Sequence, residues 1–129
     1  MKDFYDLAVI ARRTALDGKI LSEAIAATFA RRGTPLPAER PLALTREFGQ
    51  DSAKLRQWQA FLNKSRVEAP ALPHVVTLLG LLLWPPSEAA RDGGAFDLVW
   101  AYEDEDVRQW KAPMPGQARP GPQGINPPP

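Results

Sequence analysis

The stretch LPHVVTLLGLLLW, residues 72–84, is apolar nearly all round and decides the fold of this chain. A membrane-spanning helix needs about 20 such residues, so the run is too short to cross a bilayer. It predicts a buried central helix over about 73–84, which Pro73 suits as a first-turn residue and Pro85-Pro86 ends. Docking of this helix against a further domain or a partner chain stays open as the alternative.

Three more helices are predicted before this run, each with apolar residues at helical spacing. They cover about 3–15, 19–32 and 52–65. The second is the best delimited, because Asp17 can accept backbone N–H bonds at its first turn and Gly33 follows its last turn.

An extended connection, TPLPAERPLAL at residues 34–44, follows the second helix, because each proline biases the residue before it away from helix. A short turn is predicted at 45–48. Asp51 or Ser52 then caps the third helix.

The helical pattern fails beyond Ser87, and residues 95–102 predict a short strand or turn. From residue 113 the chain holds seven prolines in 17 residues, which predicts a disordered or polyproline II-like tail. The expected fold is therefore all-α, a compact bundle of about four helices. The expected division is a helical domain at 1–86, an irregular extension at 87–112 and a disordered tail at 113–129.

Composition excludes several classes of protein. The chain has 129 residues, of which 44% are apolar, and a formal net charge of +1, so no strong field favours nucleic acid or anionic lipid. It has no cysteine and one histidine, which excludes a disulfide framework and thiolate or histidine metal sites. No signal peptide pattern opens the chain. We expect a cytoplasmic protein that does not bind membranes.

The opening residues hold the first candidate site. Asp3 and Asp6 are three apart and share a helix face, and Lys2 can pair with Asp6 four residues on. Two carboxylates with an ammonium can hold a divalent metal next to a phosphate. Acidic residues in a first turn also stabilise the helix dipole without further function, and spacing leaves both interpretations open.

Two other polar features favour structural interpretations. Asp104 and Asp106 have D-x-D spacing, but no glycine-rich turn precedes them, so a solvated acidic turn is favoured. His74 has no second ligand or nucleophile at an informative spacing and is interpreted as a polar first-turn residue.

Two arginine pairs lie where two predicted helices end. Both positions suit cations at the negative pole of a helix dipole, and both also suit contacts to nucleotide or RNA phosphates. These candidate binding residues are Arg12, Arg13, Arg31 and Arg32.

Three segments together resemble the C-terminal portion of the AbiEii/AbiGii toxin family. They are MKDFYDLAVIARR at 1–13, AIAATFARRGTPLP at 24–37 and WQAFLNK at 58–64, and the resemblance covers about residues 1–84. The combination of K-D-x-Y-D with T-F-x-R-R-x-T-P carries it. The family consists of nucleotidyltransferase-fold toxins of bacterial toxin–antitoxin and abortive-infection systems.

The resemblance implies an enzyme that uses Mg²⁺ and a nucleoside triphosphate to transfer a nucleotide to an acceptor such as tRNA. The family's late catalytic aspartate corresponds to Asp3, and its neighbours correspond to Lys2 and Asp6. The family's Gly-Ser turn with a following D-x-D or D-x-E pair has no counterpart, since this sequence has no Gly-Ser dipeptide and its one D-x-D lies at the other end.

We therefore expect a C-terminal fragment or remnant of such a toxin, inactive alone and without a metal or cofactor of its own. Its expected partners are an N-terminal nucleotidyltransferase half and an antitoxin. The alternative is a non-catalytic helical interaction module. A third interpretation, a small RNA- or DNA-binding protein, is disfavoured by the near-zero net charge.

Overall fold

A computed structural model describes residues 1–101 and 109–112. Asp104, Asp106 and the predicted tail at 113–129 lie outside these residues. In chain order the elements are α1 (Lys2–Arg13), β1 (Leu16–Asp17), α2 (Gly18–Arg31), the 3-10 turn η1 (Leu42–Leu44), α3 (Arg46–Gln50), α4 (Ser52–Ser65), α5 (Leu72–Asp92), β2 (Val99–Ala101) and β3 (Gln109–Lys111).

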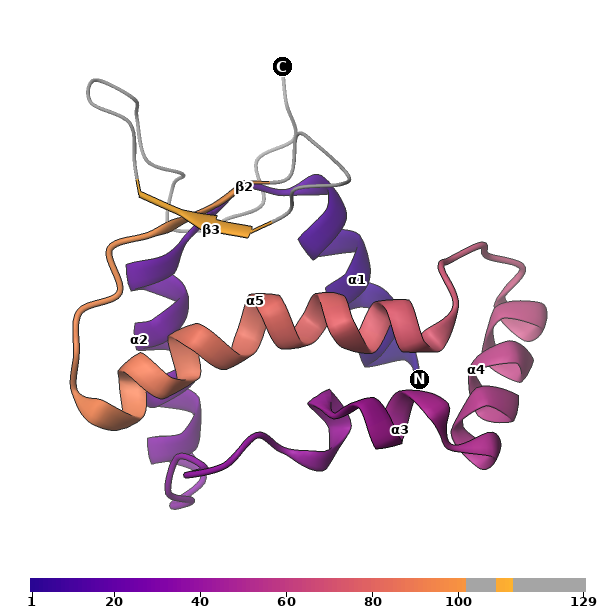
Figure 1. Ribbon diagram of the computed structural model, residues 1–129, viewed down its shortest axis with the longest axis horizontal. Coiled ribbons are helices and arrows are strands. Elements are labelled where there is room, and N and C mark those ends of the chain that lie inside the picture. The colour runs from indigo at the N-terminus through magenta and orange to yellow at the C-terminus, as the bar shows by residue number, and fades with distance from the viewer. Residues whose placement is uncertain (102–108, 113–129) are drawn as a thin grey trace.

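Helix α5 is the centre of the molecule. It runs through the middle of Figure 1, with α1 and α2 crossing it, η1 and α3 along its other side, and α4 near its start. Eight of its residues are buried: Leu72, Val75, Val76, Leu78, Leu79, Gly80, Leu82 and Pro86. The predictions of a mostly helical protein and of a buried central helix are confirmed. Within the described residues, no helix is both long and apolar enough to cross a membrane.

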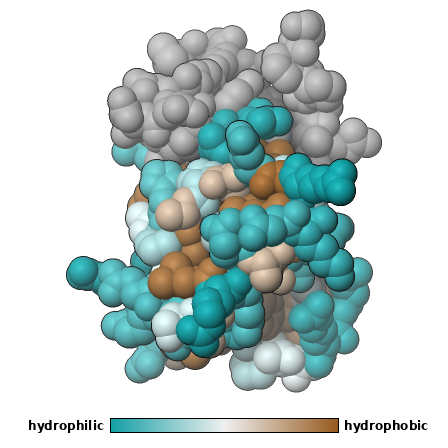
Figure 2. Space-filling view, turned by 90° about the vertical axis from the view of Figure 1, so that its right-hand side faces the viewer, coloured by the Kyte–Doolittle hydropathy of each residue, from teal (hydrophilic) through white to brown (hydrophobic). Residues whose placement is uncertain are grey.

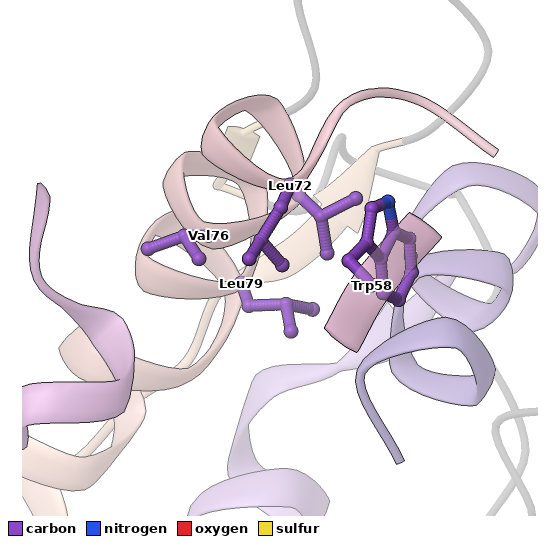
Figure 3. Close-up of a cluster of buried hydrophobic side chains, with 6 residues drawn as sticks. Trp58, Leu72, Val76 and Leu79 are labelled. Carbon is purple, nitrogen blue, oxygen red and sulfur yellow. The ribbon is translucent and has the colours of Figure 1, made fainter. Parts of the chain in front are cut away.

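The main core lies where the first half of α5 meets α4 and α1. Trp58 of α4 belongs to one buried cluster with Leu72, Val76 and Leu79 of α5, which Figure 3 shows. The Trp58 indole N–H donates to the carbonyl of Pro70 at 3.1 Å, so the buried ring keeps a partner for its polar atom.

A second core lies under a small sheet that the sequence did not predict. Its three strands are antiparallel in the order β1-β2-β3, with Trp100 opposite Leu16 on one side and Trp110 on the other. The buried Trp100 indole donates to the carbonyl of Ala11 at 2.7 Å and ties the sheet to the end of α1. Of the short strand or turn expected at 95–102, the structure shows a strand, β2.

Helix starts were predicted well. The Asp17 carboxylate accepts from the backbone N–H of Lys19 at 2.9 Å, and that of Asp51 accepts from Lys54 at 3.0 Å. Gly33 follows α2 with φ +64°, a conformation that glycine adopts readily. The turn expected at 45–48 is a five-residue helix, α3, capped by the Thr45 hydroxyl.

The predicted end of the central helix at residue 84 is wrong. Helix α5 passes through Pro85 and Pro86 and continues to Asp92. The prolines have no N–H for the carbonyls of Leu81 and Leu82 four residues earlier. The Trp110 indole N–H supplies the missing donor, at 3.1 and 3.2 Å from these two oxygens.

Parts of the extension expected to be irregular, 87–112, have regular structure. Residues 87–92 belong to α5, and β2 and β3 add two strands. A tryptophan from a distant strand therefore compensates for the proline pair that the sequence rules interpret as a stop.

We expect Trp110→Phe to lower the free energy of unfolding by about 1–3 kcal/mol, because two helix carbonyls lose their donor. Chemical denaturation measures the loss. Lys111→Ala, on an exposed neighbour in β3, is the matched control and should change little.

A double-mutant cycle tests the cause. Pro85→Ala restores an N–H that can donate to the Leu81 carbonyl, so it should recover more stability in the Trp110→Phe chain than in the parent chain. Strictly additive effects would contradict the compensation.

Gly18 marks a close approach between α2 and the segment before β2. A Cβ there would lie 2.5 Å from Phe96 Cδ2 and 2.6 Å from the Leu98 carbonyl oxygen. We expect Gly18→Ala to destabilise the protein by about 1–3 kcal/mol through overpacking. Gly94→Ala is the control, because its Cβ would meet nothing nearer than 4.0 Å. Equal melting temperatures for both variants would contradict the close approach.

Candidate functional site

The first turn of α1 presents the predicted acidic motif to solvent. Lys2, Asp3 and Asp6 are all exposed. Lys2 Nζ lies 3.2 Å from Asp6 Oδ2, and the two side chains are 79% and 49% exposed. The i, i+4 pairing predicted from sequence is confirmed, but in this exposed setting it adds little stability.

The opposite face of α1 holds the motif in place. Phe4 stacks on Phe48 of α3 with ring centroids 5.3 Å apart, and Tyr5 lies 5.8 Å from the Phe61 ring of α4. Further along, Ala8 is buried in the main core. The outward position of Asp3 is therefore fixed by apolar packing behind it.

The described residues contain no group of three or more acidic, histidine or cysteine side chains that could hold a metal ion. Asp3 and Asp6 come from one helical turn, and Asp6 is already paired with Lys2. Within the described part of the chain, His74 stands exposed in the first turn of α5 and joins no such group. Among the residues that the structure describes, these two carboxylates therefore belong to no such group.

Arg12 and Arg13 lie at the other end of α1. They line a surface hollow of about 360 Å³ together with Glu68, Ala69 and Pro70 from the segment between α4 and α5. Asp3 and Arg13 are ten residues apart, or about 15 Å along the helix. The first arginine pair is thus not part of the acidic motif.

Arg31 and Arg32 are exposed at the end of α2, where Arg31 Nη2 lies 3.4 Å from the Thr28 hydroxyl. Arg12 and Arg13 end α1, which in Figure 1 runs up to the sheet, whereas Arg31 ends α2, which starts at the sheet side and crosses to the other side of α5. Helix α2 has 14 residues and is about 21 Å long. The structure therefore does not bring the predicted nucleotide- or RNA-binding arginines into one site.

Sequence reasoning missed a second hollow, of about 280 Å³, whose lining includes Arg40 and Arg46. The stretch holding Arg40 was interpreted as a connection only. A signal was present, since two arginines flank a Leu-Ala-Leu turn in a stretch that lacks a pattern of its own.

Figure 2, which views the molecule from the right-hand side of Figure 1, shows hydrophobic patches scattered among hydrophilic atoms.

A comparison with protein families defines the class of protein. A family model described as "Nucleotidyl transferase AbiEii toxin, Type IV TA system" matches residues 1–107. The chain belongs to this AbiEii family of nucleotidyltransferase-like toxins of type IV toxin–antitoxin systems. The predicted resemblance is confirmed, and it reaches beyond the expected limit at residue 84. No curated protein and no solved structure matches the chain.

The exposure of Asp3 predicts that Asp3→Ala changes the free energy of unfolding by at most a few tenths of a kcal/mol, the effect of one first-turn carboxylate. Phe4→Ala should cost several times more, because it removes the stack on Phe48. Denaturant unfolding of both variants makes the comparison. A loss near 1 kcal/mol or more for Asp3→Ala would identify Asp3 as a structural cap.

Proposed function

We propose that this chain contributes the α1 acidic motif to an AbiEii nucleotidyltransferase and does not transfer nucleotides alone. The observation that carries the proposal is the position of Asp3. Its side chain is exposed, while Phe4 and Tyr5 on the opposite face of the same helix pack against α3 and α4. The sequence has no Gly-Ser turn with a following D-x-D pair. In our proposal that core comes from an N-terminal nucleotidyltransferase half.

The chemistry of the motif supports a role beside a triphosphate. When bound to the complete enzyme, Mg²⁺ and a nucleoside triphosphate supply the positive charge at the phosphates and the transferred group. The Asp3 carboxylate would position the metal–phosphate complex or accept a hydrogen bond from the attacking hydroxyl. The Lys2 ammonium would offset phosphate charge, which requires it to leave its exposed pair with Asp6.

We further propose that the acceptor is a nucleic acid such as tRNA. The two arginine pairs support this, because Arg13, Arg31 and Arg32 are exposed. The pairs end two different helices, α1 and α2, and so suit contacts to phosphates on different parts of one large acceptor. An antitoxin is the expected regulatory partner, in line with the type IV toxin–antitoxin family.

The pure chain should show no metal-dependent transfer when it is incubated with labelled nucleoside triphosphates and tRNA. The same α1–α5 region, joined to the nucleotidyltransferase half of an AbiEii toxin, should restore labelling and toxicity. Robust labelling by the chain alone would refute the proposal that it needs the nucleotidyltransferase half for transfer.

Variants of the joined protein test the role of Asp3. Asp3→Ala should reduce transfer by orders of magnitude, because electrostatic groups at a phosphoryl-transfer centre dominate catalysis. Glu23→Ala, an exposed carboxylate on α2, is the control and should leave transfer unchanged. Full toxicity of the Asp3→Ala protein would refute a catalytic role.

One observation favours the second candidate function, a helical interaction module. Leu81, which lines the second hollow, is 50% exposed, and Leu42, two residues before the lining residue Leu44, is 69% exposed. A module of this kind would bind a partner with or without any catalytic role of α1.

A further inference from the structure

The hollow that sequence reasoning missed is a pocket between α5 and the η1–α3 segment. Its α5 wall consists of Pro73, Val76, Thr77 and Leu81, which share one helix face because they are spaced by three, four and eight residues. The wall is mostly apolar and opens toward solvent at the exposed Leu81. We call it the Arg40–Arg46 pocket after the cations on its facing wall.

The facing wall combines one apolar side chain and one amide with two cations. Leu44 and Gln50 line it together with Arg40 and Arg46. Both arginines are exposed, and neither takes part in an ion pair or hydrogen bond among the described residues. Among residues 1–101 and 109–112, the pocket therefore offers two guanidinium groups without an acidic partner, beside apolar surface.

Gly80 fixes the place of Arg40. A Cβ at Gly80 would lie 3.0 Å from Arg40 Nη1, so the guanidinium lies against the bare backbone of α5. Glycine is unfavourable in a helix interior, yet here it leaves the space that the cation occupies. This contact holds one charge at the edge of the apolar wall.

We propose that the Arg40–Arg46 pocket binds a segment of a partner polypeptide that carries one large apolar side chain flanked by carboxylates. The apolar side chain fills the hollow, whose 280 Å³ suits a single large residue. The carboxylates pair with the two guanidinium groups, which match carboxylates in bidentate geometry.

The exposed leucines favour a polypeptide over a nucleotide. Leu81 provides exposed apolar surface at the pocket, and Leu42, exposed in η1, adds apolar surface on the segment that carries Arg40 and Leu44. An amphipathic peptide segment covers such surface with neighbouring side chains, whereas the ribose and phosphates of a nucleotide do not. The proposal stands whether or not Asp3 takes part in nucleotide transfer.

Selection from a displayed library of random peptides on the full chain tests the proposal. Enriched sequences should place Phe, Trp or Leu between Asp or Glu residues. A synthetic peptide of the consensus should bind in a fluorescence anisotropy titration, and its affinity should fall with rising salt.

Matched variants locate the site. Arg46→Glu should weaken the consensus peptide about tenfold or more, as expected for loss of a charge-assisted pair, whereas Arg56→Glu on exposed α4 should not. Leu81→Gln should weaken binding, whereas Leu55→Gln, at a leucine 38% exposed on α4, should not.

Gly80→Ala separates binding from folding. The added methyl displaces Arg40 but favours the helix, so binding should weaken while the melting temperature holds or rises. Enrichment of no sequence, enrichment of basic or neutral sequences, or full binding by Arg46→Glu would each overturn the proposal. A nucleoside triphosphate that binds in place of any peptide, in an Arg46-dependent manner, would also overturn it and identify a phosphate site.

Discussion

The hydrogen bonds from the Trp110 indole to the carbonyls of Leu81 and Leu82 complete the helix on which the molecule is built. Helix α5 contacts α1, α2, η1, α3 and β3, so its continuity fixes the position of every one of them. Two adjacent prolines remove two backbone donors from its interior. Further along, Ser22 of α2 donates to the Pro86 carbonyl at 3.0 Å. The region of the helix that sequence rules treat as its end is therefore its point of attachment to β3 and α2.

The contrast between α4 and α5 shows which features a sequence can predict. Helix α4 was predicted with its observed bounds, because its cap, Asp51, and its apolar spacing are local. The end of α5 depends on a tryptophan 28 residues beyond Leu82, which no local rule contains. The sheet escaped prediction for the same reason. Its strands have two or three residues, too few for an alternating pattern, and Trp100 is held by a bond to Ala11 from 89 residues away.

The residues of the candidate sites also separate into those that local spacing predicts and those that only tertiary packing places. The spacing of Lys2 and Asp6 correctly predicts that they pair, since i and i+4 are neighbours on any helix. Spacing says nothing about how two helices are oriented, and so the arginine pairs of α1 and α2 were grouped together although these helices end on opposite sides of α5 in Figure 1. The cations of the Arg40–Arg46 pocket were missed because Arg40 has no helical or strand context, and only packing against Gly80 gives it a place.

Helix α3 links the α1 motif to the Arg40–Arg46 pocket. Its Phe48 stacks on Phe4, directly after Asp3, while its Arg46 and Gln50 line the pocket. Gly49 lets α3 lie close to α5, since a Cβ there would be 3.1 Å from Pro73 Cα and 3.3 Å from Val76 Cβ. A side chain at position 49 would therefore push α3 away from α5. A partner seated in the pocket would hold α3 in its present place, and through the Phe48–Phe4 stack it would favour the outward orientation of the first turn of α1.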